Sequence, residues 1–243
     1  MPRNKDKVLA IIVCRMGSTR LKNKIFLKIQ KKPIIQIIYE KLSICKNIDK
    51  IIIATSKNKN DNKIENFAIK KKISYFRGSE KNVLKRIHDA SLYYKNFNII
   101  VRANTDCPLF MPTILDRDIL RFKKSNYHLL SPFFKNIIPF GFSFVIFKLL
   151  TLKKILKLAK HKKYKEHIEN FCFDNLSKFR LYPNTYKKKY MSSNLSLTLD
   201  TKNDFKRIKY IFKKLKCLNK NIKPEKIITL SKKDKILKKY NLN

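Results

Sequence analysis

The first half of the chain alternates short apolar runs with amphipathic helical patterns, and few folds accommodate such an alternation. Runs typical of buried strands occur at residues 8–13, 51–54, 73–76 and 99–101. Helical patterns lie between them, at residues 33–42, 64–71 and 83–94. Because strands that alternate with helices form parallel sheets with helices on both faces, the sequence predicts an α/β fold.

The second half of the chain has a less regular pattern. Strands are expected at residues 142–147 and 195–199, the second of them ending at Asp200. Helices are expected at residues 152–158, 168–176 and 205–218, and the lysine-rich tail after Lys223 is expected to form short helices or to fray. The length of 243 residues suits one domain, and we find no linker or internal repeat, so residues 1–243 are expected to form a single domain.

The net charge of +41 is almost entirely lysine and is spread along the chain instead of forming one patch. We interpret it mainly as a solvated lysine-rich surface, and a nucleic acid or other polyanion is the less favoured alternative. With either interpretation, the charge favours an anionic substrate such as a nucleotide.

Cysteine content and hydropathy exclude several other classes of protein. The five cysteines include no C-x-x-C pair, so neither a zinc site nor a disulfide framework is indicated, and a reduced cytoplasm is the expected setting. No apolar stretch approaches the roughly 20 residues of a membrane span. The apolar run at residues 8–13 is too short for the core of a signal peptide.

The strongest candidate for chemistry is the loop after the first expected strand. Ligands of open parallel sheets bind beyond the carboxyl ends of the strands, where this loop lies. Gly17 lets the backbone approach a phosphate, and the loop also offers hydroxyl and cationic donors at Arg15, Ser18, Thr19, Arg20 and Lys24. These donors predict a triphosphate site, and the alternative is a simple turn with solvated charges. The loop does not match the Walker A pattern.

Two aspartates stand where other expected strands end. Asp106 follows the strand at residues 99–101, together with Arg102 and Asn104, which would lie near a bound base or sugar. Asp200 ends the strand at residues 195–199. Mg²⁺ in phosphate sites takes one or two protein carboxylates, so both residues are candidate ligands. Each could instead cap the following helix, but together with the Arg15 loop they favour a metal site.

Seven segments, in this order, resemble the cytidylyltransferase family, whose members include SpsF-type polysaccharide proteins and the 3-deoxy-manno-octulosonate and acylneuraminate enzymes. The resemblance is nearest to the SpsF-type branch and covers nearly the whole chain. The loop and the two aspartate segments are specific as a set, although each alone is weak. The segments are residues 15–21, 51–56, 76–80, 83–86, 101–109, 166–167 and 199–201.

The resemblance implies a Rossmann-like nucleotide-diphospho-sugar transferase fold with a mixed, mostly parallel sheet, a Mg²⁺ cofactor, CTP and a sugar-acid substrate, and a homodimer. It places Arg15 and Lys24 on the triphosphate and Mg²⁺ on Asp106 and Asp200. It also implies that Arg77, Gly78 and Ser79 lie near the nucleotide or sugar, and that Glu166 and His167 lie near the acceptor. His167 is a candidate general base, since histidine exchanges protons near neutral pH, although a lone histidine is more often structural.

Two departures from the family pattern fall on the acceptor side. SpsF-like chains commonly carry acidic residues in the segment aligned with residues 142–147, where this chain has none, and an acidic position after Gly78 is Asn82 here. Three alternatives stay open: a nucleotide-sugar-dependent glycosyltransferase, a basic polyanion-binding protein, and a relative that binds nucleotide without turnover, which the missing acidic residues keep open. The first usually carries a D-x-D motif, which the relevant strand end lacks.

Overall fold

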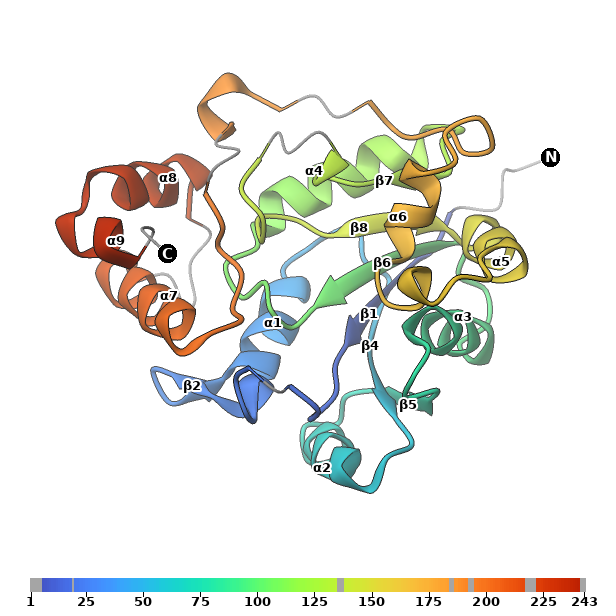
Figure 1. Ribbon diagram of the computed structural model, residues 1–243, viewed down its shortest axis with the longest axis horizontal. Coiled ribbons are helices and arrows are strands. Elements are labelled where there is room, and N and C mark those ends of the chain that lie inside the picture. Colours follow the sequence, from blue (N-terminus) through green and yellow to red (C-terminus); the bar gives the residue numbers. More distant parts are fainter. Residues whose placement is uncertain are drawn as a thin grey trace.

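The computed structural model describes residues 6–18, 20–134, 138–183, 186–191, 195–216 and 222–240. Its main sheet has the strand order β5-β4-β1-β6-β8-β7 (Figure 1). The first four of these strands run parallel, β8 is antiparallel to β6, and β7 is antiparallel to β8. The sheet is therefore mixed and mostly parallel, as predicted. Its strands are β1 (Val8–Val13), β4 (Lys50–Ser56), β5 (Tyr75–Gly78), β6 (Ile99–Asn104), β7 (Leu129–Leu130) and β8 (Val145–Lys148).

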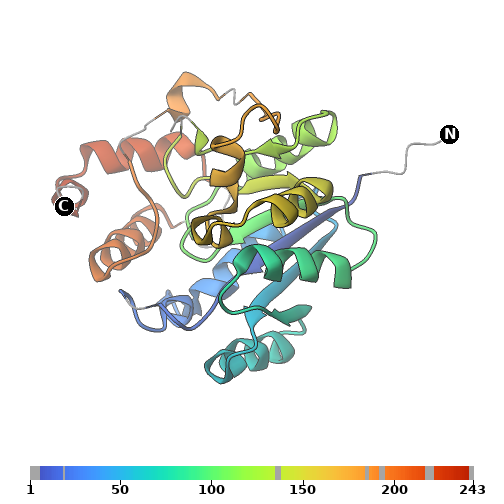
Figure 2. The same ribbon diagram turned by 45° about the vertical axis from the view of Figure 1, so that its right-hand side comes forward.

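Helices cover both faces of the sheet. One face packs against α1 (Ile34–Leu42), α2 (Asn62–Lys70), α4 (Pro112–Lys123), α7 (Lys202–Leu215) and α8 (Pro224–Lys233). The other packs against α3 (Val83–Tyr93), α5 (Leu149–Leu158) and α6 (Ile168–Phe173). Figure 2 shows α3 and α5 in front of the strands and the C-terminal helices, which include α9 (Lys235–Tyr240), gathered at one end. A small hairpin of β2 (Lys28–Ile29) and β3 (Lys32–Pro33) precedes α1.

The central strand β1 illustrates why the first half of the sequence is predictable. Its residues 8–12 are all fully buried, as expected for a strand with helices on both faces. Val8, Ala10 and Ile12 point to one layer of helices, and Leu9 and Ile11 to the other. Val13 pairs with Ala54 of β4 and Asn104 of β6, so these strands end at one level of the sheet.

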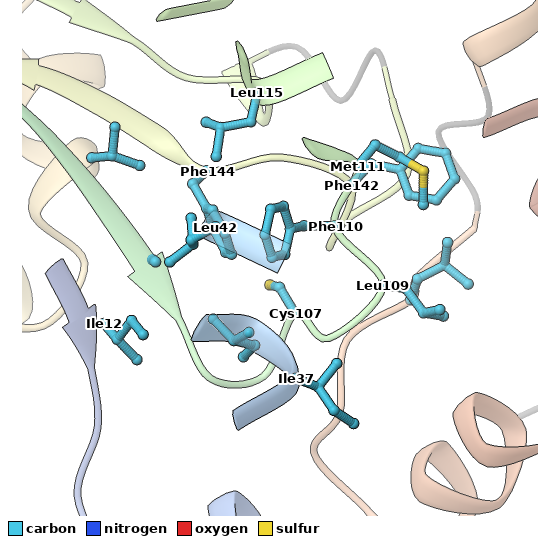
Figure 3. Packing of buried hydrophobic residues seen from close by; sticks show 14 of the residues in the cluster. Ile12, Ile37, Leu42, Cys107, Leu109, Phe110, Met111, Leu115, Phe142 and Phe144 are labelled. Atoms are coloured by element: carbon cyan, nitrogen blue, oxygen red, sulfur yellow. The ribbon is translucent and has the colours of Figure 1, made fainter. Parts of the chain in front are cut away.

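A cluster of buried aromatic and aliphatic side chains fixes the loop that leaves β6 (Figure 3). Phe110 packs against Phe144 with ring centroids 4.6 Å apart, and both side chains are almost fully buried. The Met111 amide donates to the Phe142 carbonyl at 2.8 Å. Loops gain fixed geometry from such anchoring, so the segment that carries Asp106 is held firmly against the core.

The expected strand at residues 195–199 is wrong: the structure forms no strand there. The alternation of apolar residues has another cause, because Leu195, Leu197 and Leu199 are buried in the core. The backbone makes single bonds to two different loops, from the Leu197 amide to the Phe140 carbonyl at 2.9 Å and from Leu199 to Asp106 at 2.7 Å. Only an isolated bridge between Ser196 and Phe140 forms, and in the described part of the chain it is not extended into a ladder.

Several other boundaries also differ from the expectations. The expected strand at residues 142–147 begins only at Val145, since residues 142–144 are buried in a loop. The strand expected at residues 73–76 lies at Tyr75–Gly78. Helix α6 ends at Phe173 and α7 begins at Lys202, and the tail forms helices α8 and α9. Helix α4 was not anticipated. In the part of the chain that the structure describes, no helix is both long and apolar enough to cross a membrane.

Candidate active site

A cleft of about 370 Å³ opens where β1 and β6 end. This is the edge at which open α/β sheets bind their ligands. Two residue types dominate its lining, cations and carboxylates. The lining residues are Val13, Cys14, Arg15, Gly17, Ser18, Arg20, Lys24, Ile25, Val83, Arg86, Arg102, Asn104, Thr105, Asp106, Glu166, His167 and Asp200.

The loop after β1 is pinned by a buried carboxylate, that of Asp61. Its Oδ1 accepts a hydrogen bond of 2.7 Å from the Met16 amide. Its Oδ2 accepts from the Thr55 hydroxyl at 3.0 Å and from the Ser56 amide and hydroxyl at 3.1 and 2.5 Å. Asp61 is 2% exposed and thus ties the loop to the end of β4. Because Met16 follows Arg15, this bond fixes where the loop presents its cations.

Two of the loop cations lie against Asp200 across the cleft. Lys24 Nζ is 3.1 Å and Arg20 Nη2 is 3.3 Å from the same oxygen, Asp200 Oδ1. Lys24 is the better sheltered, with 14% of its side chain exposed against 72% for Arg20. Asp200 precedes α7, which is capped by Thr201 and Asp204 in a reciprocal capping box. The helix is therefore capped without Asp200, and the carboxylate of Asp200 lines the cleft.

Asp106 and Asp200 lie on adjacent segments, joined by the hydrogen bond from the Leu199 amide to the Asp106 carbonyl. Burial raises the pKa of the Cys107 thiol, and the nearby charges of Asp106 and Asp200 raise it further. No group of three or more metal-ligating side chains occurs among the described residues. The carboxylates of Asp106 and Asp200 nevertheless line one cleft. One or two carboxylates suit Mg²⁺, which takes its other ligands from phosphate oxygens and water. The residues present therefore fit the metal that the sequence predicts.

Two further ion pairs involve residues that line the cleft. Arg15 Nη2 is 3.4 Å from Glu166 Oε1, and both side chains are partly exposed. Arg102 Nη1 is 2.6 Å from Glu169 Oε2, and both side chains are nearly buried. His167 lines the cleft beside Glu166 at the start of α6. The acceptor-side residues suggested by the sequence thus meet the triphosphate loop in one cleft.

The segment 77–79 is not among the residues that line the cleft. Arg77 instead pairs with Glu65 at 2.5 Å and donates to the Ser56 and Asn58 carbonyls. Gly78 is buried, and the Ser79 carbonyl accepts a 2.7 Å bond from Arg86. Ser79 therefore meets the cleft lining through Arg86. Thr19, the remaining predicted loop residue, lies outside the described residues.

Sequence reasoning missed three residues of the site. Arg86 belonged to a segment that carries the family resemblance, but no role was assigned to it. Asp61 stands in a polar stretch after a strand, where an aspartate is unremarkable. Glu169 lies within an expected helix, and no local pattern shows that it meets Arg102. Asp61 and Glu169 depend on contacts with distant segments, and the burial of Arg86 in the cleft is visible only in the fold.

Asp61→Asn is expected to lower the free energy of unfolding by about 2–4 kcal/mol, because a buried carboxylate that accepts from four groups is replaced by an amide. Equilibrium urea unfolding measures the change. Asp174→Asn serves as the control: its side chain is 44% exposed and pairs with Lys163, so a change below about 1 kcal/mol is expected. Equal effects of the two substitutions would contradict the role assigned to Asp61.

Comparison with known sequences places the chain in a family. A family model described as Cytidylyltransferase matches residues 9–235. A protein of Methanocaldococcus jannaschii is 35% identical over 240 residues, which cover 98% of this chain and 95% of that protein. The spore coat polysaccharide biosynthesis protein SpsF of Bacillus subtilis is 28% identical over 217 residues, which cover 86% of this chain and 88% of SpsF.

Solved structures agree with this assignment. A cytidylyltransferase from Leptospira borgpetersenii is 30% identical, with 96% of both chains covered and a TM-score of 0.82. A CMP:2-keto-3-deoxy-manno-octonic acid synthetase complexed with CTP has a TM-score of 0.64 at 13% identity, with 86% of this chain and 100% of that chain covered. The second likeness concerns the fold alone and confirms that it is Rossmann-like. By sequence and by structure, the chain belongs to the cytidylyltransferase family.

Proposed function

We propose that the protein transfers CMP from CTP to the hydroxyl group of a sugar acid, with release of pyrophosphate. The observation that carries the proposal is the composition of the cleft. Cations of the β1 loop and the carboxylates of Asp106 and Asp200 face one another at the ends of β1 and β6. A triphosphate needs charge neutralisation, and phosphoryl transfer depends on positioning and electrostatics more than on covalent catalysis.

In the proposed reaction, the acceptor oxygen attacks the α-phosphorus and the bond from that phosphorus to the bridging oxygen of the β-phosphate breaks. Arg15, Arg20 and Lys24 offset the negative charge that develops on the departing pyrophosphate. Gly17 and Ser18 line the same part of the cleft and offer backbone and hydroxyl donors. His167 is placed to receive the proton that the acceptor hydroxyl loses.

Asp106 and Asp200 would hold Mg²⁺ together with phosphate oxygens of the nucleotide. The ion would supply Lewis-acid polarisation at the phosphate. Lys24 and Arg20 pair with Asp200, so loop cations and candidate metal ligand lie side by side.

The acceptor side supports a carboxylate-bearing sugar. Asn104 and His167 line the cleft together with the cations Arg15 and Arg86, so amide and cationic donors face a bound acceptor. The relative solved with CTP is named for a keto sugar acid, and SpsF is named for polysaccharide synthesis. The family resemblance also supports a homodimer, for which light scattering of the purified chain would give the mass.

Pyrophosphate release tests the proposal. The protein is mixed with CTP, Mg²⁺ and a panel of sugars that contains octulosonic and nonulosonic acids and their neutral analogues. Release is expected with CTP and a sugar acid, and CMP-sugar should form in equal amount. A nucleotide-binding relative without turnover would give no pyrophosphate with any member of the panel, and release with neutral sugars only would contradict the sugar-acid assignment.

A further inference from the structure

A buried arginine in the cleft has no counter-ion among the described residues. Arg86, on α3, is 1% exposed and lines the cleft. Its Nη1 donates to the Ser79 carbonyl at 2.7 Å, whereas its Nε has no hydrogen-bond partner. A buried charge without a partner is costly, so native proteins normally pair it.

Arg102, the other buried arginine that lines the cleft, does have a counter-ion. Both guanidinium groups are buried and line the cleft, but Arg102 has Glu169 at 2.6 Å. No carboxylate oxygen of the described chain lies within ion-pair distance of Arg86. The carboxylates that raise the pKa of Arg86 are those of Asp61 and Glu166. Both already have partners, Asp61 in Met16 and β4 and Glu166 in Arg15.

The electrostatic surroundings increase the need for an anion. Burial lowers the pKa of the Arg86 guanidinium, and the positive charge of Arg15 lowers it further. Arg15 and Arg86 line the same cleft, and their positive charges repel each other. A phosphate or carboxylate group placed there would be attracted by both, and such charge-assisted hydrogen bonds are the strong ones.

The fold also makes room for the Arg86 side chain. A Cβ atom at Gly78 would lie 2.8 Å from Phe76 Cε1 and 3.1 Å from Arg86 Cγ, so only glycine fits beside its stem. The Ser79 carbonyl then orients the guanidinium. Gly78 and Ser79, at the end of β5, thus make room for the Arg86 side chain and orient it.

We infer that Arg86 is a ligand-binding residue that receives an anionic group, a phosphate of the nucleotide or the carboxylate of the acceptor, at the inner end of the cleft. This inference rests on the proposed function, since both groups belong to its substrates. It assigns Arg86 a counter-ion, which the residues that the structure describes do not provide. A bound substrate therefore supplies the negative charge opposite the buried guanidinium of Arg86.

Arg86→Met separates a binding role from a structural one, because methionine keeps much of the apolar stem and removes the charge. The ligand-free variant is expected to melt at the same temperature as the wild type or higher, since an unpaired buried charge is lost. Its affinity for the anionic substrate should fall about 10- to 100-fold. Arg117→Met is the matched control: Arg117 pairs with Asp118 at 2.9 Å outside the cleft. It should lower the melting temperature and leave ligand affinity unchanged.

The probes are cytidine, CMP, CTP and a sugar acid that the wild-type protein converts. A loss of affinity for CMP and CTP but not for cytidine would place a nucleotide phosphate on Arg86. Unchanged nucleotide affinity with a raised KM for the sugar acid would place the carboxylate there. A variant that melts several degrees lower with all affinities intact would overturn the inference. Wild-type protein that binds no nucleotide would refute the proposed function instead, and the ligand-free melting temperatures would still report on Arg86.

Discussion

Asp106→Asn is expected to lower kcat/KM by about a thousandfold or more, because a metal-held charge contributes several kcal/mol to transition-state stabilisation. The amide keeps the size of the side chain, and its neighbours Cys107 and Leu199 remain in contact with the segment. The melting temperature should therefore change little. Initial rates of pyrophosphate release, measured at several Mg²⁺ concentrations, give the effect.

A matched substitution distinguishes this effect from a general loss of negative charge. Asp89 lies on α3, pairs with Lys85 at 2.6 Å and does not line the cleft. Asp89→Asn should leave kcat/KM within about twofold, since surface ion pairs contribute little. Near-normal turnover of Asp106→Asn would eliminate Asp106 as a metal ligand.

Phe110→Ala has the largest expected effect on stability. The ring is fully buried, packs on Phe144 and lies under the Lys41 ammonium, which is 5.0 Å from its centroid. Removing such a ring typically costs about 3–5 kcal/mol, through lost burial and the cavity left behind. For a chain of this size, the melting temperature should drop by roughly 6–20 °C. Urea unfolding and calorimetry provide the two measurements.

The comparison for Phe110→Ala is a large apolar residue that faces solvent. Leu150 on α5 is 75% exposed, so Leu150→Ala should change the free energy of unfolding by no more than about 0.5 kcal/mol. A loss below 1 kcal/mol for Phe110→Ala would mean that the cluster in Figure 3 does not hold the Asp106 segment in place.

The parallel half of the sheet was predictable because local pattern and burial agree there. An uninterrupted apolar run such as residues 8–13 has no alternative to burial on both faces. Residues 195–199 show the limit of this reasoning. Their alternation records burial of three leucines, but a strand also needs a partner, and partners are set by the path of the distant chain. Helix α4 was missed although Pro112 marks its first turn, as is usual for proline.

That several candidate residues would line one cleft was predictable for a similar reason. Strand ends in a parallel sheet meet at one edge, so polar residues that follow strands gather there, as Arg15 and Asp106 do. Asp200 reaches the same cleft from a segment that forms no strand. Asp61 and Glu169 were not found, because each contacts a distant segment, at Met16 and at Arg102 respectively. The burial of Arg86 in the cleft is visible only in the fold. Arg77 shows the converse: its position in a resembling segment suggested the cleft, but Glu65 holds it elsewhere.

The two departures from the family pattern have structural explanations. Residues 142–145 are almost fully buried, with Phe142 and Phe144 in the core shown in Figure 3, so apolar residues serve packing there. Asn82 caps α3 by accepting from the Lys85 amide at 3.0 Å, a task that asparagine performs about as well as aspartate. Neither change removes a residue that lines the cleft.

Nucleotide binding tests the central claim most directly. Thermal unfolding is followed with each of the four ribonucleoside triphosphates, with and without Mg²⁺. A ligand at 100 times its Kd stabilises a protein by about 2.7 kcal/mol, which is readily seen as a shift in Tm. The account predicts a Mg²⁺-dependent shift that is largest with CTP. Equal shifts with all four triphosphates, abolished by salt, would indicate a basic surface without a nucleotide site and would contradict it.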